Sequence, residues 1–362
     1  MEMEARHSAP QGGRASNSEA GGHLLGARLL RHFPELVREL GGQPQVMLAE
    51  SGLDEADCER EGAASYEQWM ALVDRAAREL GAADFGMRLA LRQGGRGVYG
   101  RLGTLMAHAR TFGEATTLAV VHNNAHSLAA RVWKAATASG AHVFLGHDVL
   151  VGTLLGRCQA VEQLMLLGHL GAMVLTGGRA RAREVHFRHG NLATLRSYRR
   201  YFGCEVRFCR TEDGIAFRAA DMGFPIHDAD AHARTEAIAH LRSTFRDVRP
   251  SVSARVRGIV MQWLSTNECT SERVARLLAL HPRTMNRRLH DEGTSFQRIK
   301  DQVRCDYLAY YIGRTDVELQ VISRRLGFAE QSALSHFSQQ MLGSSPRDLR
   351  ARALRESALA RL

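Results

Sequence analysis

The pattern of apolar residues beyond residue 250 constrains the fold most strongly, because it describes the same short helical unit twice. Apolar positions at helical spacing run through 256–264 and 274–278, and after a short interruption Pro282 opens a further helix that stops at Gly293. The pattern recurs over 319–342, with a turn in its middle. Two short helices joined by a tight turn form a helix-turn-helix, so the sequence predicts two such units.

A longer helical segment, Ser295–Ile312, separates the two units. At about 1.5 Å per residue this segment is roughly 27 Å long, comparable with the ~34 Å between successive major-groove faces of B-DNA. We therefore predict an all-α C-terminal domain over residues 252–350. In it, two helix-turn-helix units joined by a long helix engage adjacent segments of the groove.

The distribution of charge agrees with a nucleic-acid partner for this region. The 362 residues include 48 basic and 38 acidic side chains, a net charge of +10. Residues 251–362 hold 18 of the basic and 11 of the acidic residues, so +7 of that charge lies in the last third. A basic module beside a nearly neutral one indicates a polyanion partner for the first and another task for the second. Coding bias is the alternative, because Arg outnumbers Lys 46 to 2.

Side chains suited to base recognition lie opposite the apolar Met285 and Leu289 in the first unit. Arg can bond both acceptors of guanine and Asn can pair with adenine, each good pair contributing ~1–3 kcal/mol of discrimination. The residues expected to contact DNA in this unit are Arg283, Asn286, Arg287, His290 and Arg288, with Arg298 and Lys300 nearby for phosphates. In the second unit the exposed polar positions are Gln331, Ser332, Ser335, His336 and Gln339. For either unit alone, a solvated helix pair is the alternative.

The region before the linker mixes helices and strands. Helical spacing covers 23–90 and 111–128, and Gln159–Leu175 resembles a buried helix. Short alternating segments typical of strands begin at Ala141, Glu184, Glu205 and Gly214. We predict an α+β domain over 23–245, a linker at 246–251, a disordered tail at 1–22 and a C-terminal tail at 351–362.

Cysteine usage and hydropathy indicate a reduced, cytoplasmic setting. The six cysteines are scattered without a C-x-x-C pair, so neither a zinc ribbon nor a disulfide framework is recognisable. The most apolar stretch, Val161–Thr176, is shorter than the ~20 residues that a bilayer requires, and it contains Glu162 and His169. We therefore expect no membrane-spanning segment and no signal peptide.

Two ordered motifs occur in the C-terminal region. The first is His281–Leu289 followed by Glu292–Phe296, and the second is Leu326–Phe328 followed by Gln331–Ser335 and Gly343–Pro346. From about Ser251 to Arg350 the sequence thereby resembles the AraC/XylS transcription regulators. The resemblance implies that both recognition helices contact promoter DNA, through Arg283, Asn286, Arg287, Gln331, Ser332, Ser335 and His336.

The sequence departs from that family's pattern in both helix-turn-helix units. The usual Gly of the first turn is Ala279, and the usual Ser cap is His281. In the second unit the aromatic comes one residue early, at Phe337, and Gln339 and Gln340 replace basic residues. Because the segment 329–342 contains no Lys or Arg, we expect the first unit to dominate affinity for DNA.

Motifs in the first half carry a second likeness. They are Ala83–Leu89, Tyr99–Gly103, Thr111–Ala115 and Tyr201–Phe208. Between about 36 and 225 the chain resembles the effector-binding domain of one AraC subgroup, related in name to arabinose-binding domains. The resemblance implies a domain that binds a small molecule and helps to form a homodimer. The polar residues we consider for the effector pocket are His122, Asn123, His126 and Trp133.

Two further patterns match the residue spacing of known binding motifs but lack the neighbouring residues and elements that those motifs need. The segment Gly95–Gly100 fits a dinucleotide fingerprint, yet no convincing strand precedes it and no acidic residue follows about 20 positions later. His122 and His126 have zinc-ligand spacing, but Asn123 stands where a metalloprotease needs its Glu. We expect no metal, no cofactor and no catalytic activity.

The sequence as a whole predicts a cytoplasmic, effector-responsive activator that binds promoter DNA and contacts RNA polymerase. An effector-independent repressor is the first alternative. An enzyme domain tethered to a DNA-binding domain is the second, although the N-terminal half contains no recognisable catalytic set.

Overall fold

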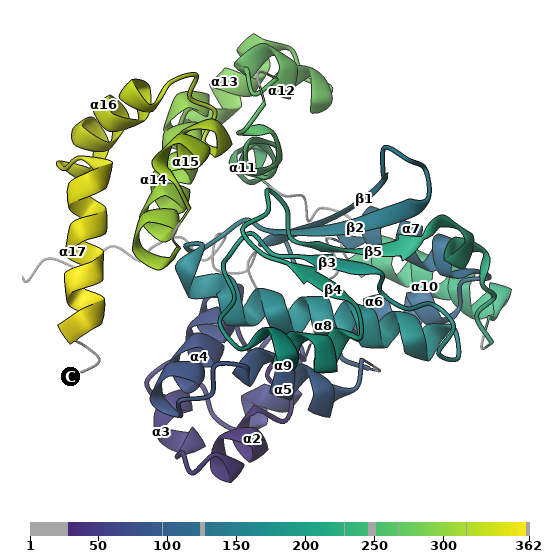
Figure 1. The fold of residues 1–362 in the computed structure, drawn as a ribbon. Helices are drawn as coiled ribbons and strands as arrows, with labels where there is room; N and C mark the ends of the chain where they lie inside the picture. The colour runs from purple at the N-terminus through teal and green to yellow at the C-terminus, as the bar shows by residue number, and fades with distance from the viewer. Residues whose placement is uncertain are drawn as a thin grey trace, which may run out of the picture.

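A five-stranded sheet organises the N-terminal part of the chain, and a group of helices at the C-terminus packs against one end of it (Figure 1). The structure is a computed structural model, and it describes residues 28–95, 97–123, 127–227, 229–244, 251–266, 268–315 and 317–359. The tail expected at 1–22 and residues 246–250 of the expected linker lie outside the described residues.

The sheet has the strand order β1-β2-β5-β3-β4. Its neighbouring strands are antiparallel, except that β3 and β4 are parallel. The strands are β1 (Ala130–Ala136), β2 (His142–Val149), β3 (Glu184–His186), β4 (Glu205–Arg207) and β5 (Gly214–Arg218). All four strands expected from the sequence are present, so the α+β prediction is confirmed.

Strand β1 was missed in the sequence. The helix expected to continue to Leu128 ends at Val121, and β1 begins soon afterwards. Only Val132 and Trp133 of β1 favour a strand by residue type, because the remaining residues are Ala, Arg and Lys. Pairing with β2 along its whole length supplies the stabilisation that its own composition lacks.

Helices cover the sheet in layers, with α8 directly beneath it and α2 to α5 below α8 (Figure 1). Helices α6, α7 and α10 pack together at the far end of the sheet. The bounds are α2 (Phe33–Glu39), α3 (Pro44–Ala49), α4 (Tyr66–Glu79), α5 (Phe85–Gln93), α6 (Gly100–Ala107), α7 (Phe112–Val121), α8 (Cys158–Leu175), α9 (Leu195–Phe202) and α10 (Ala231–Thr244).

Helix α8 is the core helix of this domain. By length and composition alone Leu155–Leu175 would suit a membrane span, yet 67% of that window is buried inside the protein. Its buried Gln163 accepts a hydrogen bond from the Trp69 indole (3.0 Å) and donates to the Leu29 carbonyl (2.8 Å). At Gly86 the backbones of α5 and α8 approach so closely that a Cβ would collide with the Gln159 carbonyl.

The C-terminal domain is entirely helical in its described residues, and it contains two helix-turn-helix units joined by α14, as predicted. Its helices are α11 (Val252–Trp263), α12 (Ser271–Leu277), α13 (Pro282–Asp291), α14 (Phe296–Arg314), α15 (Leu319–Arg325), α16 (Gln331–Leu342) and α17 (Pro346–Leu359). Residues 351–359, expected to belong to a C-terminal tail, instead continue α17. That expectation was wrong, because a run of Ala, Leu and Arg favours the helix.

We predict that Glu162→Gln changes how stability depends on pH. Glu162 is fully buried on α8 and accepts a hydrogen bond from the Tyr198 hydroxyl. Burial raises the pKa of this carboxyl from 4.5 to about 8, so the folded protein retains a proton that the unfolded chain releases. Stability contributed by this proton is therefore lost as pH rises from about 4.5 to about 8.

Urea unfolding at several pH values across that window measures the effect. Glu162→Gln should lose less stability than the wild type as pH rises, because glutamine does not titrate. The imidazole of His189 lies 3.9 Å from Glu162, and burial lowers its pKa and so disfavours the charge that would pair with this carboxylate. The same substitution at the exposed Glu272 is the control. Identical slopes for wild type and Glu162→Gln would contradict the assignment.

Candidate functional site

Helix α13 presents the expected polar face of the first unit to solvent. The His281 imidazole caps its N-terminus by accepting from the Arg283 backbone amide (3.3 Å), and Pro282 occupies the first turn. Met285 and Leu289 are fully buried, which fixes the rotation of the helix about its axis. The side chains that this rotation leaves exposed are Arg283, Asn286, Arg287, Arg288 and His290.

The turn before α13 has a left-handed residue that is not glycine. Ala279 adopts a φ of 54°, the region in which a Cβ is unfavourable by about 1 kcal/mol. This is the position where the sequence departs from the expected Gly. The turn keeps its geometry nonetheless, since the Leu280 amide bonds to the Ala275 carbonyl at 2.9 Å.

The two residues expected to contact phosphates beside α13 differ in their surroundings. Arg298 is exposed in the first turn of α14. Lys300 is only partly exposed, and its ammonium donates to the Cys269 carbonyl at 2.8 Å. Lys300 therefore braces the segment that leads into α12, a role that sequence reasoning did not anticipate.

The second unit is held against α14 by an arginine that packs on aromatic rings. The guanidinium of Arg304 lies 4.2 Å from the Phe328 ring centroid, and its Nε donates to the Leu326 carbonyl (3.0 Å) at the end of α15. Gly327 has a φ of 70°, and a Cβ there would collide with the Leu264 carbonyl. The Leu-Gly-Phe turn thus joins α11, α14 and α15.

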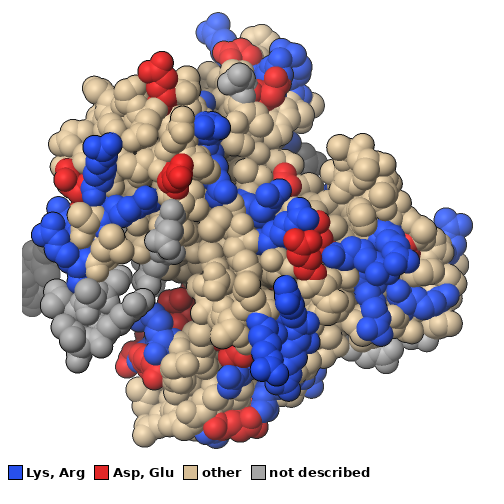
Figure 2. Space-filling view, viewed as in Figure 1, with Lys and Arg blue, Asp and Glu red and all other residues tan. Residues whose placement is uncertain are grey.

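Helix α16 has a polar outer face without Lys, Arg, Asp or Glu. Ser332 and His336 are exposed, whereas Gln331 and Ser335 are partly exposed. The Ser332 hydroxyl donates to Glu330 (3.1 Å), and the Ser335 hydroxyl donates to the Gln331 carbonyl (3.1 Å). In Figure 2, Lys and Arg side chains lie over the end of the molecule that holds α12 and α13 and along α17, with acidic residues among them.

A cavity of about 540 Å³ lies in the N-terminal domain, between the sheet, α8 and the pair α6 and α7. Its walls are mostly apolar side chains and glycine backbone. Strand β2 contributes the consecutive residues Leu145, Gly146 and His147. Gly95, Gly97 and Gly100 also line it, so the glycine pattern dismissed as a nucleotide fingerprint belongs to this wall.

The residues considered for an effector pocket are not brought together at this cavity. His122 follows the last residue of α7, and His126 lies outside the described residues. Asn123 is buried, with its amide donating to the Ala130 carbonyl at 2.6 Å. The Trp133 indole donates to Asp148 at 3.0 Å. His122, Asn123 and Trp133 are not among the lining residues of the cavity. Most of the lining residues are apolar, so a search of the sequence for polar binding residues does not find them.

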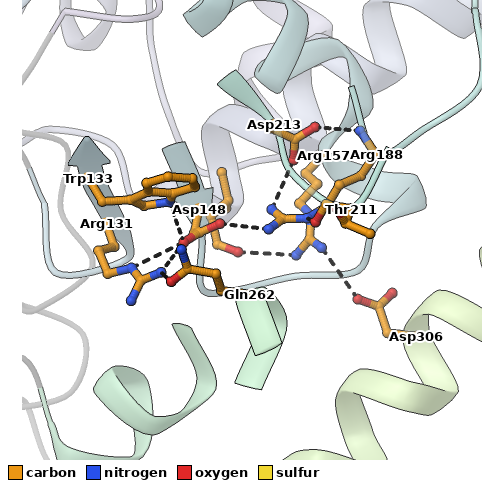
Figure 3. Close-up of polar contacts among 10 residues, drawn as sticks. Arg131, Trp133, Asp148, Arg157, Arg188, Thr211, Asp213, Gln262 and Asp306 are labelled. Atoms are coloured by element: carbon orange, nitrogen blue, oxygen red, sulfur yellow. Dashed lines mark hydrogen bonds and ion pairs between the residues drawn. The ribbon is translucent and has the colours of Figure 1, made fainter. Parts of the chain in front are cut away.

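A network of buried charges connects the sheet with the C-terminal domain (Figure 3). Its centre is Asp148 of β2, which is fully buried and accepts from Arg188 (2.8 Å) and Arg131 (2.6 Å). Burial alone would raise the pKa of this carboxyl, but the two guanidinium groups outweigh burial and hold it below 3.8. Arg131 also donates to Gln262 of α11 at 3.0 Å, so one side chain bridges the two domains.

Two residues of α14, Asp306 and Tyr310, contact the N-terminal domain. Asp306 accepts from the Leu154 amide (2.6 Å) and lies 3.7 Å from the fully buried guanidinium of Arg157. The Tyr310 hydroxyl accepts from the Gly190 amide at 2.7 Å. Apolar residues complete the interface, because Leu150 and Leu154 belong to the same buried cluster as the core of α11.

Comparisons with known proteins agree with this arrangement. A family model described as the arabinose-binding domain of AraC transcription regulator, N-term, matches residues 41–226, and a helix-turn-helix domain model matches residues 274–352. The HTH-type transcriptional regulator VirS of Mycobacterium tuberculosis is 32% identical over 339 residues, which are 91% of this chain and 97% of that protein. An uncharacterized HTH-type transcriptional regulator of the same species is 29% identical over 144 residues, 39% of this chain and 42% of that protein.

Among solved structures, the crystal structure of transcriptional regulator CdpR from Pseudomonas aeruginosa is similar to 87% of this chain and 97% of its own. The sequence identity is 20% and the TM-score is 0.42.

We predict that Asp148→Asn destabilises the protein by about 3–5 kcal/mol, the usual cost of breaking a buried ion pair. The substitution preserves shape but leaves the buried Arg188 with Asp213 as its remaining carboxylate partner in the network. Urea unfolding at pH 7 measures the loss. Glu205→Gln, which breaks the exposed contact with Arg207, is the control and should change stability little. Equal effects of the two substitutions would show that the network contributes no more than a surface pair.

Proposed function

This chain belongs to the AraC family of DNA-binding transcription regulators, and we propose that it controls transcription in response to a small molecule bound in the cavity of its N-terminal domain. Residues 23–245 form the effector domain in this proposal, and residues 252–350 form the DNA-binding domain. The observation that carries the proposal is the position of strand β2. This strand lines the cavity, and its Asp148 accepts a hydrogen bond from Arg131, which in turn donates to Gln262 of α11, the first helix of the DNA-binding domain.

The proposed DNA contacts follow from the exposed faces of α13 and α16. Arg283, Asn286 and Arg287 of α13 supply donors for base edges, and Arg288 is placed beside them for phosphate. The 19 residues of α14 separate the two helices by roughly 28 Å along its axis, close to one turn of B-DNA. Helix α16 contributes Gln331, Ser332, Ser335 and His336.

The remaining parts of the proposal concern the cell. The protein acts in the cytoplasm as an activator that contacts RNA polymerase, with the N-terminal domain supporting a homodimer. The role requires no catalysis, and the full-length relatives found are transcriptional regulators.

We predict that Arg287→Ala and Arg298→Ala weaken DNA binding in different ways. A DNA fragment selected by the protein from a random library serves as the target, and fluorescence anisotropy at several salt concentrations gives the Kd. Arg287→Ala should cost about 1–3 kcal/mol and relax the choice at one base pair. Arg298→Ala should weaken all sequences alike and reduce the salt slope by about 1. A wild-type affinity that does not vary with salt would contradict binding through phosphates.

We also predict that Gln262→Ala weakens the coupling between the domains. Thermal shift against a metabolite library identifies a ligand, and the ratio of Kd for DNA without and with that ligand measures the coupling. The wild type should show a ratio of about 5–150, the usual range for allosteric coupling. In Gln262→Ala the ratio should fall below the wild-type value while ligand and DNA still bind, because Arg131 loses its partner on α11 and the contacts of Asp306 and Tyr310 remain.

The exposed Gln302 of α14 offers a matched control, and Gln302→Ala should keep the wild-type ratio. A variant Gln262→Ala with unchanged coupling would exclude this contact as the connection. A wild-type protein that binds the ligand without any change in DNA affinity would favour the effector-independent repressor.

A further inference from the structure

The lining of the cavity is chemically uniform. Among the lining residues that the structure describes, five have polar side chains: Tyr99, Thr104, Thr116, His147 and His227. No Asp, Glu, Lys or Arg occurs among the lining residues that the structure describes. The volume of about 540 Å³ lies within the ~300–1,000 Å³ typical of sites for small organic ligands.

The polar groups offer little to a ligand with many hydroxyls. The hydroxyl of Thr116 donates to the Gly113 carbonyl (2.9 Å), and that of Thr104 donates to the Gly100 carbonyl (3.4 Å). Both protons therefore serve the helices in which these residues lie. Burial lowers the pKa of His147 to about 4, so its imidazole is neutral at pH 7 and supplies no positive charge for an anion.

A free sugar or a carboxylate would leave buried polar groups without partners in such a site. Every hydroxyl moved out of water needs a hydrogen bond, and a buried carboxylate needs a cation or several donors. The apolar surface of a ligand, by contrast, can pack against the apolar side chains of the cavity wall. That wall includes Leu102, Met106, Phe112, Leu145, Leu164, Met165, Ile215 and Phe217.

We infer that the cavity binds an uncharged, predominantly apolar molecule that carries at most one polar group. The inference deepens the proposed function, since it names the chemical class of the effector. The ligand is thus unlike the pentose after which the matching domain family is named. Contact with Leu145 and His147 places the ligand on β2, one residue from Asp148.

Competition for a fluorescent probe tests the class of ligand. The full-length protein is titrated with N-phenyl-1-naphthylamine, a neutral apolar probe whose fluorescence rises in apolar sites. Decanol, decanoate and L-arabinose are then added as competitors. Decanol should displace the probe, whereas decanoate should compete more weakly and L-arabinose should leave the signal unchanged. Displacement by L-arabinose, or stronger displacement by decanoate than by decanol, would overturn the inference.

Two residues of α7, one on the cavity wall and one on the outer surface, allow the site itself to be tested. Ala119 lines the cavity, whereas Val121 does not line it and is 64% exposed. Ala119→Phe should weaken probe binding by about tenfold or more, because the ring fills space that the probe needs. Val121→Phe should bind the probe like the wild type. Circular dichroism and thermal melts establish that both variants are folded, and equal probe binding by the two would place the apolar site elsewhere.

DNA binding by the same samples separates this inference from the proposed function. Val121→Phe should bind the selected DNA fragment with wild-type affinity in the absence of probe, since its side chain lies on the outer surface and not in the cavity wall. If decanol binds in the cavity but never alters DNA affinity, the ligand class stands and the effector role fails. If a charged or sugar ligand binds there and alters DNA affinity, the effector role stands and the ligand class fails.

Discussion

The compensation of one buried carboxylate, Asp148, is the constraint on which the rest of the structure depends. A carboxylate removed from water requires partners of opposite charge. Arg131 of β1 and Arg188, which follows β3, are these partners. Arg131 faces Asp148 directly across the β1–β2 ladder, so the pair also fixes the register of the strand that is least suited to a sheet by composition. The Trp133 indole adds a further hydrogen bond to the same carboxylate.

This arrangement places chemistry of two kinds on one strand. Towards the interior of the domain, β2 forms part of an apolar wall, and at its end it supports a polar contact with α11. A shift of the strand therefore alters both at once, because packed interiors deform little and transmit strain. Asp306 and Arg157 give α14 its own attachment to the same domain, so both helix-turn-helix units are connected to the sheet.

The two helix-turn-helix units differ in the charge of their outer faces. The first carries several arginines on α13 above a fully buried Met285 and Leu289. In the second unit, α16 contains no Lys or Arg. Arg304 of α14 lies close to this unit, but it stacks on Phe328 and donates to the Leu326 carbonyl at the end of α15. Helix α17, which was not expected from the sequence, carries the exposed Arg347 at its start, whereas Arg350 donates to the Val317 carbonyl at 2.7 Å.

The sequence by itself determined the helical half. The periodicity of Met285 and Leu289, the helix start at Pro282 and the turn at Gly327 are local signals, and helices form through local bonds. It also determined four of the five strands. Only the tertiary structure decided that Asp148, Arg188, Arg131 and Gln262 meet, and that apolar residues from α6, α7, α8 and the sheet enclose a cavity. Those contacts join residues far apart in the chain, and an apolar residue that lines a cavity has the same periodicity as one that fills a core.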